Sequence, residues 1–86
     1  MKRFKGRVRV MPRAGLLDPQ GSAVEHALGA LDFGGVDSVR VGRTLELVMD
    51  GESDAEVRAR IRSMCEKLLA NPVTEDFTID AVEALS

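Results

Sequence analysis

The two ends of the chain carry opposite charges on the same alternating pattern. The first thirteen residues contain six basic residues and no acidic one, whereas residues 71–86 contain four acidic residues and no basic one. Residues 3–10 place an apolar residue or glycine at every second position between basic side chains, which is typical of a half-buried strand. Residues 76–80 alternate apolar and polar or acidic side chains in the same way. Since opposite charges on neighbouring strands attract, we expect the first and last strands to pair.

Two segments between these strands have the apolar spacing of a helix. The first, residues 19–33, follows Asp18, which can cap a helix, and starts with a proline, whose missing N–H is not needed there. The second begins at the capping box Ser53–Glu56. It is expected to end at Ala70–Asn71, because Pro72 disfavours helical dihedrals in the residue before it.

The region between the two helices predicts two short strands. Residues 36–43 and 44–50 are strand-like, with Gly42–Arg43 as the hairpin turn between them. The order strand, helix, strand, strand, helix, strand predicts an α+β fold of the ferredoxin-like type, in a single domain spanning residues 1–86. Two right-handed crossovers would give a two-layer sandwich. Its four-stranded antiparallel sheet would run in the order four, one, three, two, with both helices on one face.

Pairing of the first strand with the last makes a prediction about individual charges. Outward-facing Arg7 and Arg9 would lie opposite Asp76 and Asp80. Each exposed pair would then contribute roughly 0.2 to 1 kcal/mol to stability.

Side chains capable of catalysis or metal binding are sparse. His26 is the single histidine, and it projects from the first helix opposite the apolar stripe, which favours a solvated surface position. Cys65 lies on the apolar stripe of the second helix, which favours a buried, inert thiol. No glycine-rich phosphate loop or metal-binding helix motif occurs. We therefore expect no catalytic residue, no metal site and no cofactor bound by this chain.

Composition also indicates the compartment and the classes of partner. A single cysteine excludes an internal disulfide and fits a reducing environment, so we expect a cytoplasmic protein. No apolar run approaches the ~18 residues of a membrane span, and no signal peptide is evident. The basic first segment has one aromatic residue, Phe4, and no interleaved series for base stacking, and the net charge is -2, so neither nucleic acid nor membrane is expected as a partner.

The segments 18–21 and 68–72, at a helix start and a helix end, contain more residues of a specific type than capping requires. Four strings in order along the chain are Leu17–Gly21 (LDPQG), Val39–Arg43 (VRVGR), Cys65–Val73 (CEKLLANPV) and Glu75–Phe77 (EDF). On these strings the chain resembles, over essentially its whole length, the small S subunit (PurS) of phosphoribosylformylglycinamidine synthase. It departs from that family at Arg43, where a lysine is common, and at Phe77, where a tyrosine is common, so it lacks the tyrosine hydroxyl there.

The resemblance implies a non-catalytic subunit in purine biosynthesis. In that family a glutaminase subunit releases ammonia from glutamine, and a large synthetase subunit uses ATP and magnesium to activate the formamide oxygen of the substrate. Ammonia then displaces phosphate, converting formylglycinamide ribonucleotide to the amidine. The small subunit helps to bring the two enzymes together as a homodimer, and pairing into a tetramer is left open.

Two sets of residues are candidates for contacts with these partners. The candidates for contact with the enzymes are Arg13, Asp18, Gln20, Arg43, Asn71, Glu75 and Asp76. The candidates for the dimer interface are Met11, Val48 and Val82, which strand alternation places on the sheet face away from the helices.

A second hypothesis from another class is a regulatory ferredoxin-like domain that senses a small molecule. It would bind an amino acid at a dimer interface near the first loop, where Gly15 and Asp18 lie. An RNA-recognition domain has the same order of elements but needs aromatic residues on its central strands, and Val8, Val10 and Leu45 provide none.

Overall fold

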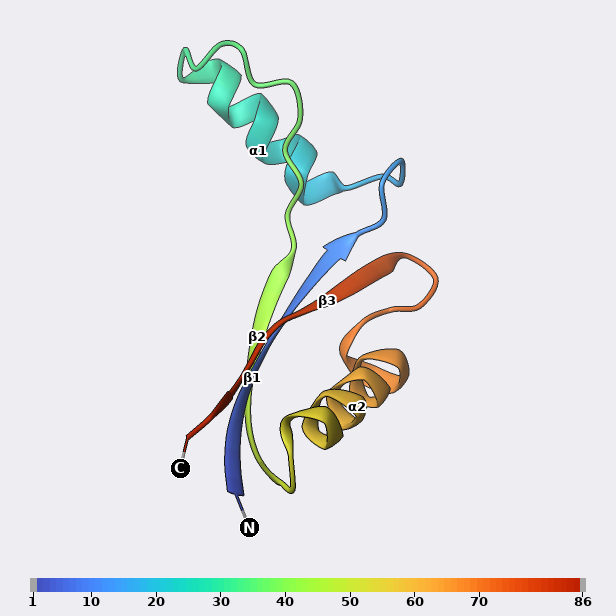
Figure 1. Ribbon diagram of the computed structural model, residues 1–86. Coiled ribbons are helices and arrows are strands. Elements are labelled where there is room, and N and C mark those ends of the chain that lie inside the picture. The colour runs from blue at the N-terminus through green and yellow to red at the C-terminus, as the bar shows by residue number, and fades with distance from the viewer. Residues whose placement is uncertain (1, 86) are drawn as a thin grey trace.

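A computed structural model describes residues 2–85 and shows one antiparallel sheet, two helices and a long projection (Figure 1). The elements are β1 (Lys2–Pro12), α1 (Pro19–Ala30), β2 (Arg43–Gly51), α2 (Asp54–Met64), a π-helical turn (Cys65–Leu69) and β3 (Glu75–Ala84). The sheet has three strands in the order β2-β1-β3, and β1 pairs antiparallel with both neighbours. The α+β class and the pairing of the first strand with the last are confirmed.

Ion pairs across the sheet confirm the attraction between the two ends, but with different partners from those expected. Arg9 bonds Asp80 at 3.2 Å, as predicted. Arg7 instead lies 3.2 Å from Glu46 on β2, because β2 also flanks β1 and presents its carboxylate on the same face. Asp76 pairs with Arg13 at 3.3 Å, beyond the end of β1. The acidic C-terminal strand is therefore held to the basic N-terminal segment at two points.

This pairing predicts a measurable charge coupling. Arg9→Glu places a carboxylate opposite Asp80 and is expected to lower the free energy of unfolding by about 1 kcal/mol. Adding Asp80→Arg should recover most of that loss. Urea unfolding of the two single variants and the double variant measures the coupling; losses that simply add would show that the two side chains do not interact. Arg58→Glu is the control, because Arg58 pairs with Asp54 on α2 and not with Asp80. Its loss of stability should not be recovered by Asp80→Arg.

Val82 was expected on the sheet face away from the helices, but it lies on the opposite face because β3 contains a bulge. The register shifts between Arg7 and Val8, so that Arg7 lies opposite Ala81 and Val8 opposite Ile79. The extra residue, Asp80, reverses the alternation beyond it. Val82 consequently packs against the core on the α2 side of the sheet.

The core lies between the sheet and α2. Its buried residues are Phe4, Val8, Val10, Val57, Ile61, Cys65 and Ala70. Gly6 is part of this layer, because a Cβ at that position would collide with Ile61 Cδ1; the absent side chain lets α2 approach β1 closely. The apolar residues of the helical pattern in α2 and those of the alternating pattern in the strands thus pack together in one layer.

The helix starts follow their predicted caps with one change. The Asp18 carboxylate accepts the Gly21 N–H at 3.0 Å and Pro19 begins α1. Ser53 Oγ accepts the Glu56 N–H at 3.2 Å. In return, the Glu56 carboxylate accepts a hydrogen bond from the N–H of Glu52. In a standard capping box it would accept the N–H of the capping residue itself, one position later.

The predicted four-stranded sheet and its covering by both helices are wrong for the protomer. Within residues 2–85 the segment 36–41 forms no strand, and Gly42–Arg43 is not a hairpin turn, because Arg43 already belongs to β2. Residues 36–42 continue β2 away from the sheet and return to α1, which ends at Ala30 rather than residue 33 (Figure 1). The physical reason is that this segment bonds to the start of α1: the Val41 N–H donates to Asp18 at 2.8 Å.

The projection gives the protomer an extended shape. We call residues 16–42 the arm; it comprises α1 and the segment that returns to β2. The radius of gyration is 16.6 Å with principal extents of 52 × 27 × 14 Å, whereas a compact domain of this length has a radius of gyration near ~12 Å. The arm therefore extends beyond the sheet instead of covering it (Figure 1).

Candidate functional site

Five of the seven candidates for partner contact gather at one end of the sheet. There the end of β1, the start of β2 and the turn before β3 meet. The residues concerned are Arg13, Arg43, Asn71, Glu75 and Asp76. We call this group the clamp.

The centre of the clamp is the pair Arg43 and Glu75. Arg43 Nη1 donates to Glu75 Oε2 at 2.6 Å and Nη2 donates to Oε1 at 3.1 Å, which is a two-pronged contact. Nη2 also donates to the Leu69 carbonyl at 2.7 Å, where the π-helical turn ends. A lysine could not make both carboxylate contacts and the carbonyl contact in this geometry, so arginine ties three segments together here.

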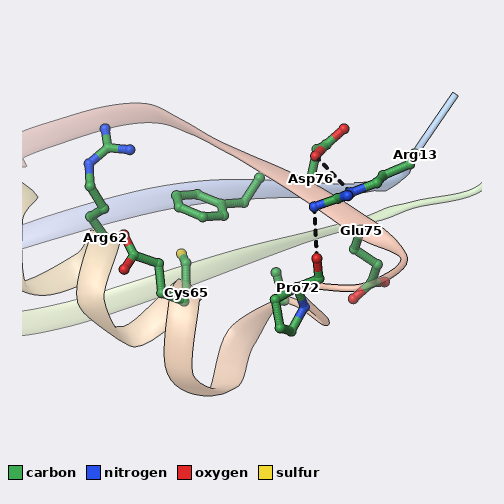
Figure 2. Close-up of a pocket in the computed structure, with 9 residues that line it drawn as sticks. Arg13, Arg62, Cys65, Pro72, Glu75 and Asp76 are labelled. Atoms are coloured by element: carbon green, nitrogen blue, oxygen red, sulfur yellow. Dashed lines mark hydrogen bonds and ion pairs between the residues drawn. The ribbon is translucent and has the colours of Figure 1, made fainter.

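The asparagine of the CEKLLANPV string organises the turn into β3. Asn71 Oδ1 accepts the Val73 N–H at 3.0 Å, and its carbonyl accepts the N–H of Glu75 at 2.8 Å. The Asn71 N–H donates to the Glu75 carboxylate at 2.8 Å. Arg13 closes the turn from the β1 side, donating to the Pro72 carbonyl at 2.7 Å beside its ion pair with Asp76 (Figure 2).

These bonds fix the charge of Glu75 and rigidify the turn. The hydrogen bonds from Arg43 and from the Asn71 N–H lower the pKa of Glu75 below its ordinary value of 4.5. Its carboxylate is therefore ionised across the neutral range. The clamp therefore holds the turn before β3 in a fixed conformation.

A hollow of about 490 Å³ lies beside the clamp (Figure 2). It is lined by Arg13, Arg62, Cys65, Glu66, Ala70, Pro72, Glu75, Asp76 and Phe77. The Arg62 guanidinium lies 5.8 Å from the centre of the Phe77 ring. Nothing in the sequence alone joins these two positions. Burial raises the pKa of the Cys65 thiol, which makes it a poor nucleophile.

Asp18 and Gln20 lie apart from the clamp, at the start of the arm. Asp18 accepts the N–H groups of Gly21 and Val41, and the bond from Val41 contributes most to lowering its pKa. A Cβ at Gly21 would collide with the Val39 carbonyl, so glycine is required where the two sides of the arm cross. Asp18, Pro19 and Gly21 of the LDPQG string are thereby explained, whereas Leu17 and Gln20 are exposed.

The surroundings of Asp18 disfavour the hypothesis of an amino-acid sensor. A hollow of about 460 Å³ does lie beside Gly15 and Asp18. However, the carboxylate that would attract a ligand's ammonium group already accepts two backbone N–H groups.

The candidates for the dimer interface are divided between two faces. Val48 is 54% exposed on the sheet face away from α2, and Met11 is half-buried beside Gly42. Val82 packs against the core. The interface prediction therefore rests on Met11 and Val48.

The described residues hold no cluster typical of a metal site. Residues 2–85 contain no group of three histidine, cysteine or acidic side chains placed to hold an ion. Within the same range neither helix has the length and apolarity needed to cross a bilayer.

The comparisons with known proteins decide the family. The profile described as PurS, phosphoribosylformylglycinamidine (FGAM) synthase, matches residues 5–83. The chain belongs to the PurS family. It is 41% identical over 83 residues to the PurS subunit of Bacillus subtilis, covering 96% of this chain and 98% of the relative. It is 49% identical over 72 residues to the Mycobacterium leprae PurS subunit, covering 84% and 87%.

Solved structures of PurS proteins share the extended fold. Thermus thermophilus PurS superposes with a TM-score of 0.85 at 38% identity, covering 98% of this chain and 99% of that one. A chain in the structure titled PurLQS from Thermotoga maritima superposes with a TM-score of 0.82 at 29% identity, covering 99% and 100%. Since these alignments span nearly the whole chain, they include the arm.

The clamp makes a prediction about pH. Glu75→Gln should lower the free energy of unfolding by about 1–2 kcal/mol at neutral pH, because a charge-assisted contact is lost. The folded pKa of Glu75 lies below its unfolded value, so this contribution is complete above pH 4.5 and is lost as the pH falls through the folded pKa. Urea unfolding of both proteins from pH 7 down to pH 3 tests this; a difference that stays constant over that range would contradict it.

Proposed function

We propose that the chain is the non-catalytic S subunit of an FGAM synthase and bridges its glutaminase and synthetase subunits. Membership of the PurS family carries this proposal. Glutamine-derived ammonia would then reach the synthetase and convert formylglycinamide ribonucleotide to formylglycinamidine ribonucleotide in de novo purine biosynthesis.

The geometry supports a bridging role because it offers rigid surface where other chains can bind. The clamp fixes the turn before β3 by bonds from three segments, while Asp76 remains 69% exposed at its edge. Gln20 is exposed near the start of α1, on the arm. Two such surfaces at separate places suit an adaptor with two partners.

The chemistry belongs to the partner subunits in this proposal. ATP and magnesium would bind the synthetase, and glutamine would be hydrolysed on the glutaminase, with no cofactor held by this chain. The chain would act in the cytoplasm as a homodimer through Met11 and Val48, with a tetramer as the further possibility.

Reconstitution tests the proposal. The chain alone is expected to have neither glutaminase nor synthetase activity, and to restore glutamine-dependent FGAM formation when added to the two purified enzymes. Formation from ammonia by the synthetase alone is the control for intact chemistry. Glutamine turnover by the chain alone that disappears in Cys65→Ser, or no gain on mixing, would contradict the proposal.

Within that experiment one pair of variants examines the bridging surface. Asp76→Ala, at the exposed edge of the clamp, is expected to raise the concentration of chain needed for half-maximal restoration about tenfold. Arg58→Ala, on the outer face of α2, should leave it unchanged. If both variants needed the same concentration for half-maximal restoration, the clamp would not be part of the surface that binds the partners.

A further inference from the structure

Arg62 differs from every other arginine of the chain. Each of the others donates a hydrogen bond to a carboxylate or to a backbone carbonyl of the same protomer. Within residues 2–85 Arg62 forms no hydrogen bond or ion pair, and its guanidinium lies over Phe77 instead. An arginine can hold a carboxylate through two parallel N–H groups. The N–H groups of Arg62 are therefore available to an anion from another molecule.

The contact with Phe77 holds this guanidinium in place without using its donors. A cation is attracted to the face of an aromatic ring, whereas the five N–H groups of arginine lie around the edge of its planar group. Phe77 is half-buried and packs against the core, so the ring itself is fixed. Because Arg62 is already positioned, it loses less conformational freedom when it binds a partner.

Arg62 lies at one end of the hollow beside the clamp (Figure 2). Arg13 and Asp76 lie at the other end, where they are bound to each other at 3.3 Å. The rest of the lining includes four apolar residues, Cys65, Ala70, Pro72 and Phe77. An apolar hollow with a charged group at its rim suits an apolar side chain that lies next to a charged one.

The charges around the hollow favour an acidic occupant. Arg43 neutralises Glu75, and Arg13 neutralises Asp76. Among the described lining residues this leaves Arg62 and Glu66 without an ion pair. Glu66 is exposed, so that water and salt screen its charge, whereas Arg62 has one face against an aromatic ring. The charge that is positioned for a contact is therefore the positive one.

The surroundings of the hollow indicate a partner that binds through side chains. β3 is an edge strand, but the bulge at Asp80 interrupts its regular pairing, which disfavours the addition of a further strand. The hollow lies on the α2 side of the sheet, whereas Val48 is exposed on the opposite face. It therefore stays accessible when Val48 is covered in the proposed homodimer.

We propose that Arg62 binds a carboxylate of a partner enzyme, on a segment whose neighbouring apolar side chain enters the hollow. This inference rests on the bridging role in the proposed function and specifies the chemistry of one contact. The occupant is a protein segment because one positioned cation is too few polar groups to orient a small metabolite. The same cation is enough to select one side chain within a larger interface.

Reconstitution with charge variants tests the contact. Arg62→Glu is expected to raise the concentration of chain needed for half-maximal glutamine-dependent FGAM formation about 30-fold, because a carboxylate then faces a carboxylate. Arg62→Lys keeps the charge but not the planar pair of donors, and should raise it only about threefold. Arg58→Glu is the matched control. It makes the same change one turn earlier on α2, where Arg58 pairs with Asp54, and should leave that concentration unchanged.

Glu66→Gln determines the sign of the occupant's charge. It removes a like charge near the partner's carboxylate and should lower the half-maximal concentration about twofold. A rise for Glu66→Gln together with a fall for Arg62→Glu would show a basic occupant and contradict the proposal.

A variant that fills the hollow tests the apolar part of the contact. Ala70→Leu enlarges a lining side chain without changing charge and should raise the half-maximal concentration about tenfold. Ala59→Leu, at an exposed alanine of α2, should leave it unchanged. Equal values for two variants that melt cooperatively would show that no side chain enters the hollow. If Ala70→Leu does not fold, the charge variants decide the proposal.

The outcomes separate this inference from the proposed function. Restoration by the parent with equal values for Arg62→Glu and Arg58→Glu would contradict the contact at Arg62 and leave the bridging role intact. No restoration by the parent would contradict the bridging role, and this inference with it.

Discussion

Ile61→Ala is expected to leave the chain largely unfolded at 37 °C. Ile61 is fully buried at the centre of the core, and its Cδ1 occupies the space above Gly6. Truncation removes this contact and leaves a cavity, which typically costs 2–5 kcal/mol. A single core in a chain of 86 residues supplies only about 3–5 kcal/mol. Circular dichroism melts should therefore show loss of the cooperative transition.

The matched control for this variant changes the same position more gently. Ile61→Val removes one methylene and should cost about 0.5–1.5 kcal/mol, leaving a cooperative transition at lower temperature. If Ile61→Ala instead cost less than 1 kcal/mol, the layer between β1 and α2 would not be the main source of stability.

Val48→Asp is expected to weaken the association of the proposed homodimer strongly while leaving the protomer folded. Val48 is 54% exposed on the sheet face away from α2 and is not part of the core, so the substitution leaves the core unchanged. The two-fold axis buries two carboxylates for one substitution. At about 1–3 kcal/mol each, this should raise the dimer dissociation constant on the order of 100-fold or more.

Sedimentation across a dilution series measures this effect. The parent is expected to remain dimeric to lower concentration and to melt at a temperature that depends on protein concentration. Val73→Asp, at an exposed valine in the turn before β3, should change association far less than Val48→Asp. Equal effects of the two substitutions would contradict the proposed face.

The sequence predicted the parts of the fold that are set by local pattern. Alternation and opposite charge located β1 and β3 and their pairing, and the Ser53 cap located α2. The bulge at Asp80 was not predictable, because nothing in the residues around it distinguishes an extra residue from regular pairing. Its consequence was the wrong face for Val82.

The missing fourth strand has a different cause. Residues 36–41 do have a strand-like pattern, but the pattern does not say whether another strand lies beside them to pair with. The direction of this segment depends on long-range bonds, notably from Val41 N–H to Asp18 and from Arg40 to the Pro12 carbonyl. Periodicity within a window of the sequence contains no information on such contacts.

The candidate site was predicted in its residues but not in its geometry. Asn71 and Glu75 lie in the strings that carry the family resemblance, but the bonds of Glu75 to Asn71 and Arg43 emerged only from the structure. The contact between Arg62 and Phe77 was not predictable, because the two residues lie on different elements and no local pattern joins them.

Sedimentation of the three purified proteins together tests the bridging function most directly. The glutaminase and synthetase alone should sediment separately, and adding the chain should move both into one complex, under conditions that support glutamine-dependent synthesis. Asp76→Ala should require more chain for the same shift. Co-sedimentation of the two enzymes without the chain, or separate sedimentation with it present, would contradict the role as a bridge.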